Sequence, residues 1–157
     1  MRKRINISLH PLFIIISCVY LVIFFTYGIK NLKEMINLGY NQEGLTGLIV
    51  SILAISMFAY LVLVRYRKVD IYEDRYVLKS IIASRTIMFT EVASIRQVPL
   101  NLFHLRLGSV GLMGVISFTS NPEHYNVSDL GNTIRIALKN NEVIHFSCDK
   151  PDELTEK

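Results

Sequence analysis

The sequence predicts a membrane α + β protein, in which a two-helix transmembrane hairpin precedes a small antiparallel β barrel or sandwich with a short C-terminal helix. Two stretches, residues 11–29 and 45–64, contain no formal charge. After residue 68 the pattern changes to alternating apolar and polar side chains, rich in β-branched and aromatic types. Residues 1–68 hold eight Lys and Arg against two Glu, a net charge of +6, whereas residues 69–157 hold nine against eleven acids, a net of −2. We therefore expect two parts, the hairpin over 1–68 and the β domain over 69–157.

The composition excludes several classes of protein. The 157 residues are 51% hydrophobic and only 19% charged, with a mean hydropathy of +0.36. This disfavours both an ordinary soluble domain, in which about a quarter of residues are charged, and a disordered chain. Two cysteines cannot build a disulfide scaffold or a four-thiolate metal site. Because the basic excess flanks the apolar stretches, it indicates the lipid bilayer and not nucleic acid as the partner.

The two uncharged stretches have the length of membrane spans. At a rise of about 1.5 Å per residue, nineteen and twenty residues make helices close to the roughly 30 Å hydrocarbon core. A core helix of a soluble protein usually carries a polar stripe, which is missing here. A cleaved signal peptide is disfavoured because no small residues form a cleavage site after the first stretch. We expect the first helix to run on to a C-cap at Gly39.

The orientation follows from the basic residues beside the spans. Those on the outer flanks of the hairpin are Arg2, Lys3, Arg4, Arg65, Arg67 and Lys68. The connector contains only Lys30 and Lys33. This asymmetry predicts a multi-pass protein of the cell (inner or cytoplasmic) membrane with both termini cytoplasmic. Since neither span contains an ionisable residue of the kind that marks a transport pathway, we expect an anchor. In it, Gly47, Ser51, Ala54 and Ala59 would let the helices approach closely.

The β domain is predicted strand by strand. Alternation indicates strands at 69–72 and 76–79, one long strand or two over 80–89, and further strands at 95–98, 115–119 and 125–127. A helical turn over 90–94 would have Thr90 as its N-cap. The clearest signal is a hairpin of 133–138 and 143–148 joined by a turn at 139–142. Asp149 is expected to cap a final helix. No helical crossovers are present, which favours an antiparallel arrangement.

Three segments of the C-terminal part carry a resemblance. They are VDIYEDRYVLK at 69–79, IMFTEVASI at 87–95 and IRIALKNNEVIHFSCDKPDEL at 134–154. Together with the two preceding spans, they resemble the membrane-tethered bacterial PH-like domain proteins. The resemblance implies a bent seven-stranded sheet closed by a C-terminal helix. It implies no single function and supplies no catalytic residues.

The sequence contains no recognisable catalytic, metal-binding or nucleotide-binding motif. The four histidines, His10, His104, His124 and His145, lack the spacing of a zinc site. Glycines at 108, 111 and 114 are spaced by three, unlike a dinucleotide or phosphate loop. We therefore expect no catalytic, cofactor or metal site, no enzyme activity and no nucleic-acid partner.

The resulting expectation is a non-catalytic interaction or regulatory module that is anchored in the membrane and binds another membrane or cytoplasmic protein. The alternative is a lipid-headgroup sensor, for which the candidate interaction patch is Arg85, Arg96 and Arg106. The net charge of −2 on residues 69–157 argues against that alternative. A less favoured possibility is a membrane-integral enzyme that uses Ser109, His104 or His124.

Overall fold

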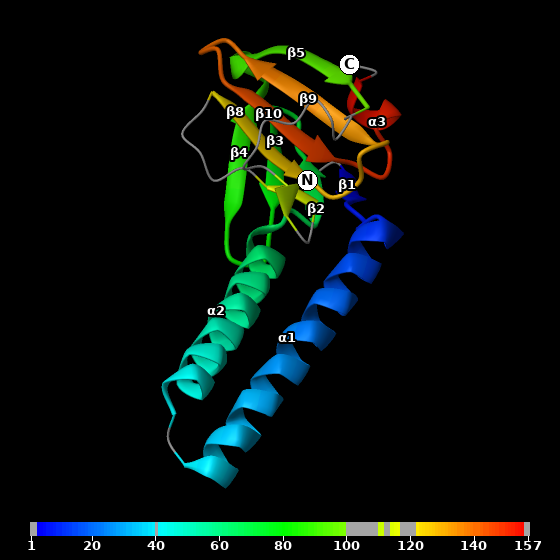
Figure 1. Cartoon of the computed structure of the whole chain (residues 1–157). Coiled ribbons are helices and arrows are strands. Elements are labelled where there is room, and N and C mark those ends of the chain that lie inside the picture. Colours follow the sequence, from blue (N-terminus) through cyan, green and yellow to red (C-terminus); the bar gives the residue numbers. More distant parts are fainter. Residues whose placement is uncertain (1–2, 40, 100–109, 112–113, 117–121, 156–157) are drawn as a thin grey trace.

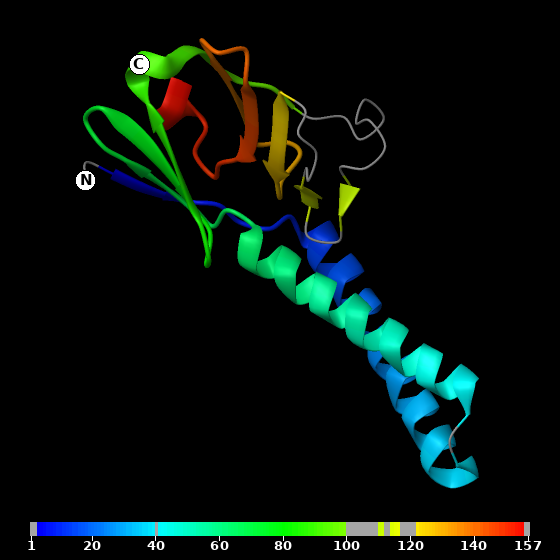
Figure 2. The ribbon, with the colours of Figure 1, turned by 90° about the vertical axis from the view of Figure 1, so that its left-hand side faces the viewer.

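A hairpin of two long helices carries a β domain of two sheets at one end (Figures 1 and 2). The computed structural model describes residues 3–39, 41–99, 110–111, 114–116 and 122–155. Among these, a four-stranded sheet has the order β1-β2-β3-β4 and a six-stranded sheet the order β5-β9-β10-β8-β7-β6. The two sheets face each other without being joined into a closed barrel within the described residues, so the barrel form of the predicted fold is wrong and the two-layer form is confirmed.

Both predicted spans are helical. Helix α1 covers Pro11–Leu38 and α2 covers Gln42–Val64, and both are long and apolar enough to cross a membrane. Pro11 occupies the first turn of α1, where its missing N–H costs nothing. The helix ends at Gly39, whose φ of 80° lies in the region that favours glycine, and this confirms the predicted C-cap. Asn41 begins α2 by accepting a 2.5 Å hydrogen bond from the backbone N–H of Gly44.

Small residues let the two helices pack closely, as predicted. Gly47 and Ser51 are buried, and a Cβ atom added at Gly47 would collide with the amide of Asn31 on α1. Of the other two small residues predicted at this contact, Ala54 is half-buried and Ala59 is exposed. The hydroxyl of Tyr20 donates a 3.1 Å hydrogen bond to the carbonyl of Ala54. The outer faces of the hairpin expose large apolar side chains, which a lipid environment would cover.

The first sheet contains a strand that the sequence analysis missed. Its strands are β1 (Lys3–Asn6), β2 (Lys68–Ile71), β3 (Arg75–Lys79) and β4 (Ser84–Met88), all antiparallel to their neighbours. β1 precedes α1, so the chain enters the hairpin from the same sheet to which it returns after α2. Residues 80–83 form a turn, and the predicted strand over 80–89 therefore begins only at Ser84.

The second sheet includes one parallel pair. After the short 3₁₀ helix η1 (Phe89–Glu91), its strands are β5 (Val92–Gln97), β6 (Val110–Gly111), β7 (Gly114–Ile116), β8 (Glu123–Val127), β9 (Thr133–Leu138) and β10 (Val143–Ser147). The β9–β10 hairpin is confirmed. It inserts β10 between β9 and β8, so β10 runs parallel to β8, and the expectation of a purely antiparallel domain is wrong. No helix is needed for this crossover because β9 itself carries the chain back.

Apolar side chains of both sheets meet in the main core, which the four-residue helix α3 (Asp152–Thr155) closes at one side. A smaller cluster joins Leu61 of α2 to Ile116 of β7. The fully buried members of the main core include Val69, Leu78, Ile87, Ile136, Ile144, Phe146 and Leu154. A helical turn is present as η1, but the predicted bounds of 90–94 are wrong because residues 92–94 belong to β5. Its N-cap is Met88 and not the predicted Thr90, and the backbone N–H of Met88 donates to the carboxylate of Glu91. Predictions over residues 100–109 and 117–121 lie outside the described residues.

Residues 3–10, which we call the N-terminal clasp, tie the start of α1 to the β domain. The backbone N–H of Ile7 donates to the carbonyl of Arg67 at 2.9 Å, and Ile7 itself is buried. The backbone N–H and hydroxyl of Ser8 donate to the carboxylate of Asp149 at 2.7 and 2.8 Å. Asp149, predicted as a helix cap, thus binds the clasp, and α3 begins only at Asp152.

A buried carboxylate joins the first three strands. Asp70 on β2 has no exposed side-chain area and accepts from Arg4 Nε on β1 at 2.6 Å and from Lys79 Nζ on β3 at 2.8 Å. The hydrogen bond from Arg4 is the largest cause that lowers the pKa of Asp70 from 3.8 to about 2. Lys3 likewise pairs with Glu153 at 2.8 Å. Two of the basic residues expected beside the membrane therefore form ion pairs within the domain.

Candidate interaction cleft

A cleft opens between the two sheets along β4 and is divided into two cavities that share Arg85. The helix-proximal cavity, of about 260 Å³, lies at the end of α2, and its lining includes Tyr60, Val64, Tyr66, His124 and Asn126. The distal cavity, of about 380 Å³, lies beside η1 and the β9–β10 turn, and its lining includes Thr86, Thr90, Glu91, Lys139 and Asn140. We call the two together the inter-sheet cleft.

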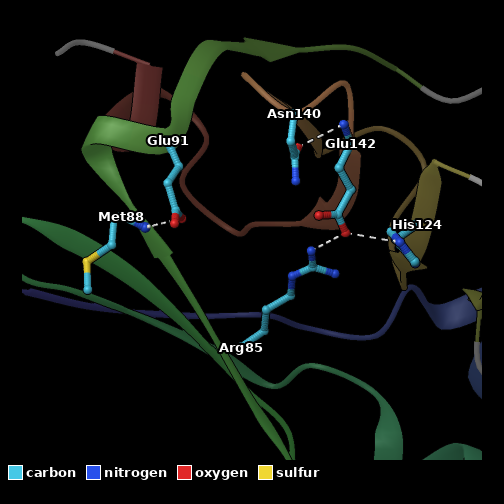
Figure 3. Close-up of polar contacts among 6 residues, drawn as sticks. All are labelled: Arg85, Met88, Glu91, His124, Asn140 and Glu142. Carbon is cyan, nitrogen blue, oxygen red and sulfur yellow. Dashed lines mark hydrogen bonds and ion pairs between the residues drawn. The ribbon is translucent and has the colours of Figure 1, made fainter.

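An ion pair bridges the cleft from one sheet to the other. The Arg85 guanidinium on β4 donates to the Glu142 carboxylate at the start of β10, and His124 Nε2 on β8 lies 3.0 Å from the same carboxylate oxygen (Figure 3). The backbone N–H of Glu142 donates to the side chain of Asn140 at 3.0 Å. The bond from Arg85 is the first cause that lowers the pKa of Glu142, so the carboxylate is ionised at neutral pH.

The local sequence places Glu142 at this point. Asn141, directly before it, has a φ of 67°, a conformation that asparagine tolerates better than most residues. This turns the chain sharply between β9 and β10, as the sequence predicted for residues 139–142. The backbone of Leu138 then donates to the carbonyl of Glu142 at 2.8 Å and closes the turn.

The inner end of the cleft is fastened to the end of α2. Asn126 on β8 accepts a 3.0 Å hydrogen bond from the backbone N–H of Tyr66 and donates at 3.3 Å to the carbonyl of Val64. These bonds satisfy backbone groups where α2 ends. Burial raises the pKa of the Tyr66 phenol, which stays neutral. The helix-proximal cavity therefore lies directly beside the end of α2 and is lined by both polar and apolar side chains.

The outer side of β4 is a free strand edge among the described residues, because β4 pairs only with β3. The backbone N–H of Phe89 donates to the carbonyl of Asp74, which fixes the alternation of the ladder. By this alternation the backbone groups of Ser84 and Thr86 point away from β3. Both residues are exposed, and Thr86 also lines the distal cavity. An edge of this kind can accept an extended chain as an additional strand.

The predicted interaction patch is distributed over different elements. Arg85 lies in the cleft and is paired with Glu142. Arg96 lies on β5, where its register partner on β9 is Arg135, and its side chain is exposed. Arg106 lies outside the described residues. Sequence reasoning missed Glu142 as the partner of Arg85, because the two residues are 57 positions apart and neither lies in a recognisable motif.

The outer flank of α2 presents basic residues that differ in their surroundings. Arg67 is exposed and Lys68 half-buried. Arg65 is half-buried, and its Nε and Nη1 atoms have no hydrogen-bond partner in the part of the chain that the structure describes. Burial, followed by the charge of Arg67, lowers the pKa of Arg65. Arg2 lies outside the described residues.

Within residues 3–39, 41–99, 110–111, 114–116 and 122–155, no group of three or more His, Cys, Asp or Glu could hold a metal ion. His145 stacks on Tyr125 with ring centroids 4.5 Å apart, and burial lowers its pKa to about 4, which keeps it neutral. Of the three candidate enzyme residues, His104 and Ser109 lie outside the described residues and His124 pairs with Glu142.

No protein-family model, no curated protein and no solved structure matches the chain. Two apolar helices followed by a β-sheet domain nevertheless agree with the layout that the resemblance implies. The pattern in the sequence and the geometry of the chain are therefore the basis for the function proposed next.

Proposed function

We propose that this protein is a membrane-anchored, non-catalytic interaction module that presents a PH-like β domain at the cytoplasmic face of a bacterial membrane. The observation that carries the proposal is the pairing of β1 with β2 across the hairpin, from Lys3–Ile71 to Asn6–Lys68. The chain both enters and leaves the hairpin through one sheet, so two attachments hold the domain beside the helices. A domain held in this way meets membrane-bound partners at a raised effective concentration.

The inter-sheet cleft is the surface that such a partner would use. It offers the free edge of β4 for backbone hydrogen bonds and, beside that edge, a cavity of about 380 Å³ for a side chain. The partner we propose is another membrane or cytoplasmic protein that contributes an extended segment to this edge. The strand-edge donors at Ser84 and Thr86 would give affinity, and the cavity lining would give specificity.

The test uses a photo-crosslinking amino acid in the full-length protein in its own cells. We expect a crosslinker at Ser84, on the outward edge of β4, to give a reproducible adduct, whereas one at Gly131, an exposed site two residues before β9, gives none. A second variant, Thr86→Pro, removes an outward N–H without removing a ladder bond to β3, so the domain should keep its protease resistance.

The adduct from Ser84 should fall several-fold in the Thr86→Pro background. If the adduct forms equally well with proline at 86, or equally from 84 and 131, the edge of β4 is not the binding surface. If the adduct falls because Thr86→Pro unfolds the domain, protease resistance is lost as well. In that case the milder variant Thr86→Val serves as the test, because it keeps the backbone donor and should keep the adduct. Loss of the adduct in that variant also contradicts strand pairing.

The alternative function, lipid-headgroup sensing, is favoured by one observation. Arg65 lies just after the end of α2, and its Nε and Nη1 atoms are buried without a hydrogen-bond partner among the described residues, so an anionic lipid phosphate could accept from them only if the side chain turned outward. In vesicles that contain anionic lipid, amide exchange at residues 65–68 should be slower than in zwitterionic vesicles. Arg65→Gln should abolish the difference and the matched variant Arg67→Gln should retain it. Equal exchange in the two lipids would remove this alternative.

A further inference from the structure

The turn between β3 and β4 exposes two large apolar side chains. Ile81 and Ile82 are 51% and 56% exposed. The turn is rigid, because the backbone N–H of Ser80 donates to the carbonyl of Ala83 at 2.9 Å and the Ser80 hydroxyl bonds the backbone of Ala83 in both directions at 3.0 Å. Two adjacent isoleucines on a well-ordered turn are costly in water, which indicates that something apolar covers them.

The same turn is fastened to the last turn of α2. The backbone N–H of Ile81 donates to the carbonyl of Leu63 at 3.1 Å. Leu63 is one residue before the end of α2 at Val64. In both views the tip of the β3–β4 hairpin lies beside this end of the helix (Figures 1 and 2). The 23 residues of α2 are slightly longer than the roughly 30 Å that a hydrocarbon core requires, so Leu63 lies close to the edge of that core.

The two ends of the β3 strand differ in chemistry. Toward the helices, residues 80–83 carry no charge and contain both isoleucines. At the opposite end, the β2–β3 turn contains Glu73 and Asp74, which are exposed, followed by Arg75. The sheet therefore has an apolar end at the level where α2 leaves the bilayer and a charged end away from it. This polarity matches a lipid surface on one side and water on the other.

We propose that the β3–β4 turn is a third membrane contact, which inserts Ile81 and Ile82 into the same leaflet that α1 and α2 enter. The inference rests on the proposed membrane anchor and extends it. The apolar surface of the turn continues the lipid-facing surface of α2. A backbone hydrogen bond joins Ile81 directly to Leu63 in the last turn of that helix. The contact sets the tilt of the β domain relative to the bilayer, because it lies to the side of the helix axis (Figure 2).

The experiment places an environment-sensitive NBD fluorophore on single cysteines of the full-length protein in phosphatidylcholine–phosphatidylglycerol vesicles. Cys18 is first replaced by alanine. Cys148 can remain, because it is fully buried and burial raises the pKa of its thiol to about 11. The test variant is Ile82→Cys, the solvent control is Asp74→Cys, and the lipid control is Leu53→Cys, whose position is 64% exposed in the middle of α2.

We expect nitroxide-labelled lipid to quench the fluorophore at 82 several-fold more than at 74, and aqueous iodide to quench it less. If the fluorophore at 82 behaves like the one at 74 while the one at 53 is quenched by lipid, the turn does not insert and the anchor stands. If the fluorophore at 53 also behaves like the one at 74, the membrane anchor itself is wrong and this inference falls with it. The three positions thus separate the two failures.

Discussion

Replacing Asp70 with asparagine removes a buried charge that three strands share, and the structure gives the size of the expected effect. The pKa of Asp70 is lowered from 3.8 to about 2 in the folded protein. A shift of this size corresponds to about 2 kcal/mol of stabilisation of the ionised form. The effect should be smaller than for a fully buried pair, because the side chains of Arg4 and Lys79 remain 45% and 33% exposed.

We therefore expect Asp70→Asn to lower the free energy of unfolding of the β domain by about 2 kcal/mol at neutral pH. The measurement is pulse proteolysis of the full-length protein in detergent micelles over a urea series. The matched control is Asp74→Asn, an exposed carboxylate 3.7 Å from Arg75, for which we expect a change below about 0.5 kcal/mol.

The effect of Asp70→Asn on stability should also depend on pH. Because the folded pKa of Asp70 lies below its unfolded value, its stabilisation is present above about pH 4 and is lost as the pH falls toward 2. The difference in stability between wild type and Asp70→Asn should therefore shrink over this range. A variant that unfolds at the wild-type urea concentration at neutral pH, or a difference that does not change with pH, would refute the role of this carboxylate.

Three further outcomes follow from the structure. Gly47→Leu should separate the helices, because any side chain at 47 meets Asn31, and disulfide crosslinking between cysteines placed on α1 and α2 should fall several-fold. Glu142→Gln should lower the stability of the β domain by about 1 kcal/mol, measured by the same proteolysis assay, because it weakens a charge-assisted bond to Arg85 in a half-buried site. Cys148 should resist a thiol reagent at pH 8 until the domain unfolds in urea, as followed by mass spectrometry.

Each of these outcomes has a result that contradicts it. Unchanged crosslinking in Gly47→Leu would mean that the helices do not approach at that residue. A neutral Glu142→Gln would mean that the bridge across the cleft contributes nothing to the fold. Labelling of Cys148 under native conditions, at the rate seen in urea, would show that the core between the sheets is open.

The sequence predicted the helices well because their signal is local. The signals are long uncharged stretches, a glycine at a helix end and small residues at the helix contact. Each of them depends only on residues nearby in the sequence or on the solvent around the helix. The β9–β10 hairpin was found for the same reason, since its strands and turn are contiguous. The parallel pairing of β8 with β10 depends on which strands meet in space, and nothing within residues 123–127 encodes the direction of the partner.

The strand β1 could have been found, and the reason it was missed is physical. Ile5 and Ile7 alternate with polar residues, as in a half-buried strand, and both are buried in the core. The neighbouring Lys3 and Arg4 instead favoured a basic flank beside a membrane span. Both patterns are present in the same residues, and only the partners Glu153 and Asp70, which lie far along the chain, show what the two cations bind.

The end of β8 and the residue that follows it help to hold the β domain at the hairpin. Asn126 binds the backbone at the end of α2, and two residues later the carbonyl of Ser128 accepts from the backbone N–H of His10, directly before α1. The Ser128 hydroxyl also donates to the carbonyl of Ser8 at 2.8 Å. One short segment therefore fastens both helices where they meet the domain. Since His124 on β8 shares the Glu142 carboxylate with Arg85 on β4, a strand added at the edge of β4 would be coupled to the helix ends through this ion pair and β8.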